Sequence, residues 1–143
     1  MLAYAATLTP DEEDGGFVVT FRDIPEAITQ GRTIDEALRS AADALTIALD
    51  GYVEAGCAFP DASPARAGEH LVSLPALVAA KLELYRRMWQ TGTSRVALAR
   101  MLGVDERAVR RLLAYKHRSH IGQIEAALAK LGKRLEISVR DAA

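Results

Sequence analysis

The 143-residue chain has one cysteine, three histidines and few aromatic residues, and it lacks a long apolar run. Cys57 alone cannot form a disulfide within the chain or supply the several thiolates of a structural zinc site. The uncharged segment between Glu69 and Lys81 is too short to cross a bilayer. The first residues lack the basic side chains of a secretory signal. These absences predict a soluble cytoplasmic protein without a membrane segment, metal or cofactor.

Each half of the chain is poor in charge of one sign. Residues 1–70 contain 4 basic and 13 acidic residues, a net charge of −9, whereas residues 71–143 contain 14 basic and 6 acidic residues, a net charge of +8. The nearly neutral total of −1 conceals this division. Such an asymmetry predicts two partners of opposite charge, one for each half.

The N-terminal half has the pattern of a small sheet with one helix. Alternation at 2–8 and a β-branched, aromatic run at 17–21 predict two strands joined by a hairpin, and shorter strands are predicted at 27–30 and 71–74. A capping-box pattern at 33–36 begins a helix whose apolar residues recur every three or four positions. This half is therefore predicted to be α+β.

After Pro75 the pattern changes to helices. Apolar spacing, capping residues and glycine stops predict four helices, at about 75–91, 94–102, 105–115 and 119–131. Alternation at Leu135, Ile137 and Val139 predicts a short C-terminal strand. We therefore expect two domains, 1–70 and 75–143, with a boundary that depends on where the strand near residue 74 ends.

Residues 94–113 have the pattern of a helix-turn-helix, with two short helices that meet at Gly103. This segment resembles the Cro/repressor-like family, in which the second helix enters the major groove of DNA. At about 100° per residue, the second helix places arginines on one face and aliphatic residues on the other. These sets are Arg107, Arg110 and Arg111 against Val109, Leu112 and Leu113.

The arginine face predicts contact with DNA. The candidate DNA-binding residues are Arg95, Glu106, Arg107, Arg110, Arg111, Lys116 and Arg118. Glu106, Arg107 and Arg110 lie near the start of the second helix, where side chains usually reach base edges. Arg95 and Arg111 are expected to contact phosphate, which Glu106 would repel. The alternative is that the arginines form the solvated face of a small helical bundle.

Several short motifs of the N-terminal half occur in a specific combination. They are Tyr4, DGGFVV at 14–19, FRDIP at 21–25, TQG at 29–31 and TIDEAL at 33–38. This combination resembles the HicB antitoxin family of bacterial toxin–antitoxin pairs, one branch of which continues into a helix-turn-helix. Two departures, Arg22 in place of proline and Glu26-Ala27 in place of glycine, change a loop near the expected toxin contact.

The resemblance implies a reduced ribonuclease-H-like fold without a working active site. It also implies binding to a small HicA-type toxin that cleaves mRNA and carries a basic RNA-binding surface. The net charge of −9 suits such a partner, because opposite charges steer association. Asp23 is the candidate toxin contact, with residues 11–14 as long-range steering charges.

The predicted C-terminal strand also suggests an assembly. Leu135, Ile137 and Val139 would leave an exposed apolar edge in a monomer. Pairing with the same strand of a second chain gives a homodimer, or a higher even-numbered oligomer, that presents two helices to successive major grooves. The alternative is that this strand pairs within its own chain.

These patterns together predict a dimeric antitoxin and repressor of its own operon, and not an enzyme. One alternative is a one-component transcriptional regulator whose N-terminal domain senses a small ligand. Another is a metal-dependent nuclease, which would need several carboxylates converging on Mg²⁺. The carboxylates available for it in the first half are Asp14, Asp23, Glu36 and Asp43.

Overall fold

A computed structural model describes residues 2–142 of the chain. The chain divides into two compact units, with the boundary between residues 79 and 80. We call these the N-terminal unit and the C-terminal unit. The boundary lies inside helix α2 (Ala76–Thr91). The described residues form four strands and five helices, so the predicted mixture of α and β structure is confirmed.

The N-terminal unit contains one antiparallel sheet. Its strands are β1 (Ala3–Pro10), β2 (Phe17–Phe21), β3 (Ile28–Gly31) and β4 (His70–Ser73). They lie in the order β3-β2-β1-β4, so β3 and β4 are the edge strands. Register pairs Ala6 with both Phe21 and His70, which places the start of β4 and the end of β2 on either side of the middle of β1. All four strands predicted for the N-terminal half are present, with ends shifted by a few residues.

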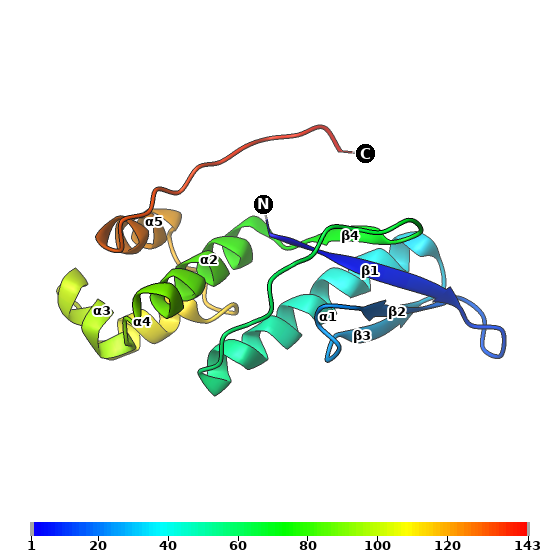
Figure 1. Ribbon diagram of the computed structural model, residues 1–143, viewed down its shortest axis with the longest axis horizontal. Helices are drawn as coiled ribbons and strands as arrows, with labels where there is room; N and C mark the ends of the chain where they lie inside the picture. The colour runs from blue at the N-terminus through cyan, green and yellow to red at the C-terminus, as the bar shows by residue number, and fades with distance from the viewer. Residues whose placement is uncertain (1, 143) are drawn as a thin grey trace. The chain divides into compact units, whose positions relative to one another are not determined.

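Helix α1 (Ile34–Ala55) packs along one face of this sheet (Figure 1). The buried side chains that meet there are Tyr4, Ala6, Val19 and Phe21 of the sheet and Ala37, Ala41, Leu45, Leu49 and Val53 of the helix. Thr33 caps the helix by accepting a hydrogen bond from the Glu36 amide at 3.1 Å, as predicted. The Glu36 carboxylate accepts from the Arg32 amide at 3.2 Å, one residue earlier than a capping box requires.

Strand β3 meets the beginning of α1 at a distance that only glycine permits. A Cβ atom at Gly31 would lie 2.3 Å from the Ala37 nitrogen and 2.6 Å from its Cα atom. Backbone atoms of a capped helix cannot move aside as a flexible side chain can. We therefore expect Gly31→Ala to lower the free energy of unfolding by about 3 kcal/mol or more, measured by urea titration.

Gly51 supplies a matched control within α1, because a Cβ atom there would have no neighbour within 4 Å. Gly51→Ala should raise the free energy of unfolding by about 0.5–1 kcal/mol, since alanine favours a helix interior over glycine. Equal stability of the Gly31→Ala variant and the wild type would contradict this close approach.

The C-terminal unit contains the rest of α2 and three shorter helices, α3 (Arg95–Leu102), α4 (Glu106–Leu113) and α5 (Ile121–Lys130). Leu84, Leu98, Val109 and Ile124, one from each helix, are completely buried and form the core. The four predicted helices are therefore confirmed. On α2, Trp89 is 49 % exposed, and its Nε1 donates to Tyr85 Oη at 2.9 Å.

The C-terminal strand predicted around Leu135 does not form in the single chain. Residues 133–142 have no helix or strand, and Ile137 and Val139 are 79 % and 93 % exposed. A strand requires a neighbour for its backbone groups, and no part of residues 2–142 pairs with this segment. The alternative in which this segment pairs within its own chain is therefore wrong.

No helix within residues 2–142 has both the length and the apolar character needed to cross a membrane.

Candidate functional site

The arginine face of α4, formed by Arg107, Arg110 and Arg111, is exposed. A three-residue turn, 103–105, precedes the helix, and Gly103 begins it with a φ of 67°. The Asp105 side chain accepts from the Ala108 amide at 2.8 Å and caps α4. The opposite face of α4 is buried through Val109, Leu112 and Leu113. Local capping and apolar spacing thus orient the three arginines toward solvent.

Glu106 shares the exposed side of α4 with Arg110 and forms an ion pair with it. Its Oε1 lies 3.1 Å from Arg110 Nη2 and 3.3 Å from Arg110 Nε, and the two side chains are 43 % and 68 % exposed. An exposed pair one helical turn apart contributes only about 0.3–0.5 kcal/mol. Arg110 therefore remains available to exchange Glu106 for another anion or for a base edge.

The other predicted DNA-binding residues lie in the helix before α4 and in the segment after it. Arg95 is the first residue of α3 and is half-buried, directly after Ser94, whose hydroxyl caps that helix. Lys116 and Arg118 are exposed in the segment that follows α4. The Lys116 ammonium lies 5.7 Å from the centre of the Tyr115 ring, within the range of a cation–π interaction.

Lys81 is a polar residue near this helix that the sequence analysis missed. Only 1 % of Lys81 is exposed, and its ammonium donates to the carbonyl oxygens of Arg111 and Leu112, each at 3.0 Å, and to Ser119 Oγ at 2.7 Å. Burial lowers the pKa of Lys81 to about 8. The sequence does contain a signal for this burial, because Lys81 occupies a position that helical spacing assigns to the apolar face of α2.

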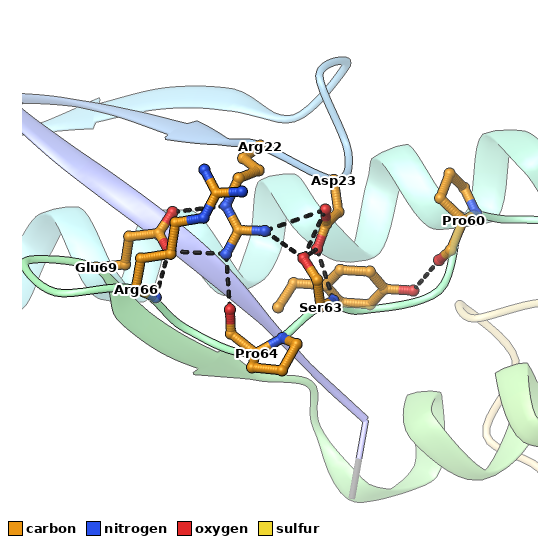
Figure 2. Close-up of polar contacts among 8 residues, drawn as sticks. Arg22, Asp23, Pro60, Ser63, Pro64, Arg66 and Glu69 are labelled. Atoms are coloured by element: carbon orange, nitrogen blue, oxygen red, sulfur yellow. Dashed lines mark hydrogen bonds and ion pairs between the residues drawn. The ribbon is translucent and has the colours of Figure 1, made fainter.

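A second cluster joins the loop after β2 to the linker between α1 and β4 (Figure 2). The Asp23 carboxylate accepts from the Ser63 amide at 2.8 Å and from the Ser63 hydroxyl at 2.7 Å. The Arg22 guanidinium donates to Glu69 at 2.9 and 2.8 Å and to the Pro64 carbonyl at 2.9 Å. We call Arg22, Asp23, Ser63 and Glu69 the linker network.

The linker network gives Asp23 partners inside its own chain. Asp23 is half-buried, and Ser63 lowers its pKa first through the backbone hydrogen bond and then through the hydroxyl. A side-chain hydrogen bond from Arg22, followed by one from the Arg66 amide, lowers the pKa of Glu69 to about 2. The structure thus gives a role to Arg22, which joins the loop after β2 to the linker.

The low pKa of Glu69 predicts a pH dependence of stability. Because its folded pKa lies below the ordinary value of 4.5, the ionised carboxylate stabilises the fold above pH 4.5, and this contribution is lost as the pH falls toward 2. The difference in unfolding free energy between the wild type and Glu69→Gln should therefore shrink over that range. Arg22→Met should remove the same dependence. Parallel pH curves for the wild type and Glu69→Gln would exclude this role for the pair.

The four carboxylates considered for a nuclease are not brought together. Within residues 2–142, no three or more histidine, cysteine, aspartate or glutamate side chains form a group that could hold a metal ion. Asp23 is engaged by Ser63 in the linker network, and Glu36 accepts from the Arg32 amide. Neither of these carboxylates thus points to a shared Mg²⁺ site.

Comparison with known proteins places this fold in a family. Residues 3–83 match the family model of HicB-like antitoxins of bacterial toxin–antitoxin systems. Antitoxin HicB of Escherichia coli (strain K12) is 38 % identical over 136 residues, which cover 95 % of this chain and 98 % of that protein. Antitoxin HicB of Pseudomonas fluorescens (strain Pf0-1) is 39 % identical over 146 residues, with 99 % and 97 % covered.

A further relative, Antitoxin HicB 2 of Photorhabdus laumondii, is 42 % identical over 127 residues, which cover 89 % of this chain and 90 % of that protein. The similarity to these relatives therefore extends over both units, whereas the family model covers the first unit and the start of α2. The chain belongs to the HicB-like family of antitoxins of bacterial toxin–antitoxin systems.

Proposed function

We propose that this protein is a cytoplasmic antitoxin with two binding surfaces. Its N-terminal unit masks a HicA-type, mRNA-cleaving toxin, and its C-terminal unit binds operator DNA as a helix-turn-helix and represses its own operon. The division of charge carries this proposal. Residues 71–79 have no charged side chain, so the charges of −9 and +8 belong to the two compact units themselves.

Charge complementarity supports the proposal that the N-terminal unit binds the toxin. An acidic surface attracts a basic RNA-binding protein and competes with RNA for it. Glu12, Glu13 and Asp14 are exposed in the β1–β2 hairpin, where they are suited to long-range attraction. Asp23 would contribute to toxin binding at shorter range. It holds the linker between α1 and β4 through Ser63, and the exposed part of its carboxylate would contact the toxin. Such masking is stoichiometric and requires no catalytic group.

The exposed face of α4 supports the proposal that the C-terminal unit binds DNA. Arg107 and Arg110, with Glu106, would read base edges, since they lie on the first two turns of the helix. Contacts to phosphate would come from residues at the periphery, namely Arg95, Arg111, Lys116 and Arg118. The Asp105 cap and Gly103 turn fix the geometry with which this face is presented.

The exposed C-terminal segment supports assembly of a homodimer or a higher even-numbered oligomer. Leu135, Ile137 and Val139 alternate with polar residues, and their segment has no strand partner within the part of the chain that the structure describes, residues 2–142. Pairing with a second copy would bury these side chains and satisfy the backbone groups. It would also supply the two recognition helices that a pair of operator half-sites requires.

Co-expression with the small protein encoded beside this gene tests the proposal. We expect the full chain to restore growth that the neighbouring protein arrests, and to co-purify with it. An Arg107→Ala/Arg110→Ala variant should still restore growth, because the proposed toxin surface lies in the other unit. Failure of the full chain to bind the neighbouring protein would exclude this partner. The ligand-sensing regulator would then be the account to test.

A further inference from the structure

The end of helix α4 differs from the ends of α1 and α3. Those helices end at Gly56 and Gly103, whose left-handed backbones turn amide groups back onto the final carbonyl oxygens. Helix α4 ends at Ala114, which is extended, with φ −74° and ψ 124°. The Ala114 amide bonds to Arg110 O at 2.9 Å, which leaves later carbonyl groups of the helix to be satisfied by other donors.

Lys81 supplies those donors from a different helix. Its ammonium reaches the carbonyl oxygens of Arg111 and Leu112, and Ser119 Oγ donates to Arg111 O at 3.3 Å. A positive charge at this end of a helix is favoured by the helix dipole. Within residues 2–142, no carboxylate forms a hydrogen bond or an ion pair with Lys81, so its interactions are with carbonyl and hydroxyl groups.

From this geometry we propose that Lys81 is a positioning residue for DNA contact, which ties the last turn of α4 to α2 and to the beginning of α5. That turn carries Arg110 and Arg111, and Lys81 bonds directly to the carbonyl of Arg111. The inference rests on the DNA binding proposed above. Because α4 has only eight residues, the anchoring of its last turn determines where two of the three arginines of the arginine face lie.

The experiment compares DNA affinity in three variants with that of the wild type. Lys81→Met keeps the length and apolar stem of the side chain and removes the amine. Lys130→Met removes an equal charge from an exposed position on α5, and thus measures the loss of general attraction to DNA. Ser119→Ala removes one of the three partners of Lys81 and carries less risk to folding. The probes are a duplex from the region immediately upstream of the gene and a scrambled duplex of equal composition.

On the upstream duplex, we expect Lys81→Met to bind about tenfold more weakly than Lys130→Met, a difference of about 1.4 kcal/mol. Ser119→Ala should lie between the wild type and Lys81→Met. Hydrogen exchange at the amides that end α4 should quicken in Lys81→Met and not in Lys130→Met. Equal affinity and equal exchange in these two variants would overturn the inference.

A pH profile separates positioning from a merely structural role. The amine bonds to the carbonyl oxygens of Arg111 and Leu112 and to Ser119 Oγ. One titratable group, His117, contacts a partner of the amine, because its Nδ1 lies 3.2 Å from Ser119 Oγ. Because Lys81 loses its proton near pH 8, the affinity of the wild type should fall between about pH 7 and about pH 9.5 more steeply than that of Lys81→Met. Identical profiles would contradict the proposal.

The readouts also separate the two proposals from each other. A wild-type protein that binds neither duplex would refute the proposed DNA-binding function. Hydrogen exchange would then still show whether Lys81 anchors α4. Selective binding by the wild type together with unchanged behaviour of Lys81→Met would leave DNA binding intact and refute the positioning role.

Discussion

Alanine in place of Arg107 or Arg110 is expected to weaken binding to the upstream duplex by about 1–3 kcal/mol for each substitution and to relax the preference for particular bases. Both guanidinium groups are exposed on the side of α4 opposite its buried residues. An arginine that reads a guanine edge makes two hydrogen bonds, and the wrong base leaves them unmade. Affinities for a panel of single-base variants of the duplex measure both effects.

The ion pair between Glu106 and Arg110 sharpens this prediction. Removal of Arg110 leaves the Glu106 carboxylate without the partner it has at 3.1 Å, in a position where it repels phosphate. The loss in Arg110→Ala should therefore be partly recovered in Glu106→Gln/Arg110→Ala. No such recovery is expected when Glu106→Gln is combined with Arg107→Ala, because the ion pair involves Arg110 only.

Arg111→Ala is the control for contacts that carry no sequence information. It should weaken binding to all duplexes by a similar factor. The slope of log affinity against log salt concentration should become shallower by about 1, which corresponds to the loss of one phosphate contact. Unchanged affinity of Arg107→Ala/Arg110→Ala for the upstream duplex would show that α4 is not the reading helix, whatever the behaviour of Arg111→Ala.

Ile137→Lys is expected to convert the assembled protein to monomers. Ile137 and its neighbours Leu135 and Val139 form one face of the segment that is proposed to pair with a second copy. A lysine on that face would need to be buried, and an unpaired buried charge is strongly unfavourable. Sedimentation velocity gives the mass directly. The monomer should also bind the upstream duplex more weakly, because one chain presents only one copy of the proposed recognition helix.

Ser138→Lys provides a matched control at the next residue. It adds the same charge, and alternation along a strand places residue 138 on the opposite face from Ile137. We expect this variant to keep the mass of the wild type. Dissociation of both variants would indicate a general charge effect, and retention of the wild-type mass by Ile137→Lys would refute pairing through this face.

The elements of the fold could be predicted because their signals are local. Thr33, Ser94 and Asp105 each cap a helix within three residues of their own position, and Gly56 and Gly103 each end one. Strand alternation is likewise a property of neighbouring residues. The C-terminal strand shows the limit of such reasoning, since alternation describes a segment that is able to pair and does not identify its partner.

The candidate site residues could be predicted from the sequence only where they all lie on one helix. The arginine face follows from spacing along α4, whereas Asp23 and Ser63 are 40 residues apart and Arg22 and Glu69 are 47 apart. No local pattern joins residues so distant in the chain. Lys81 was missed for a related reason, because a lysine in a sequence suggests exposure to solvent, while two of its three partners are backbone carbonyl groups that no side-chain motif reveals.

Inhibition of RNA cleavage by the neighbouring protein tests masking most directly. Purified full-length antitoxin would be titrated into a fixed concentration of that protein well above the dissociation constant, with cleavage of a labelled mRNA as the readout. The account predicts a linear loss of cleavage that ends at a fixed molar ratio, and the same endpoint for the Arg107→Ala/Arg110→Ala variant. Undiminished cleavage at excess antitoxin, or complete inhibition at a small fraction of that ratio, would contradict it.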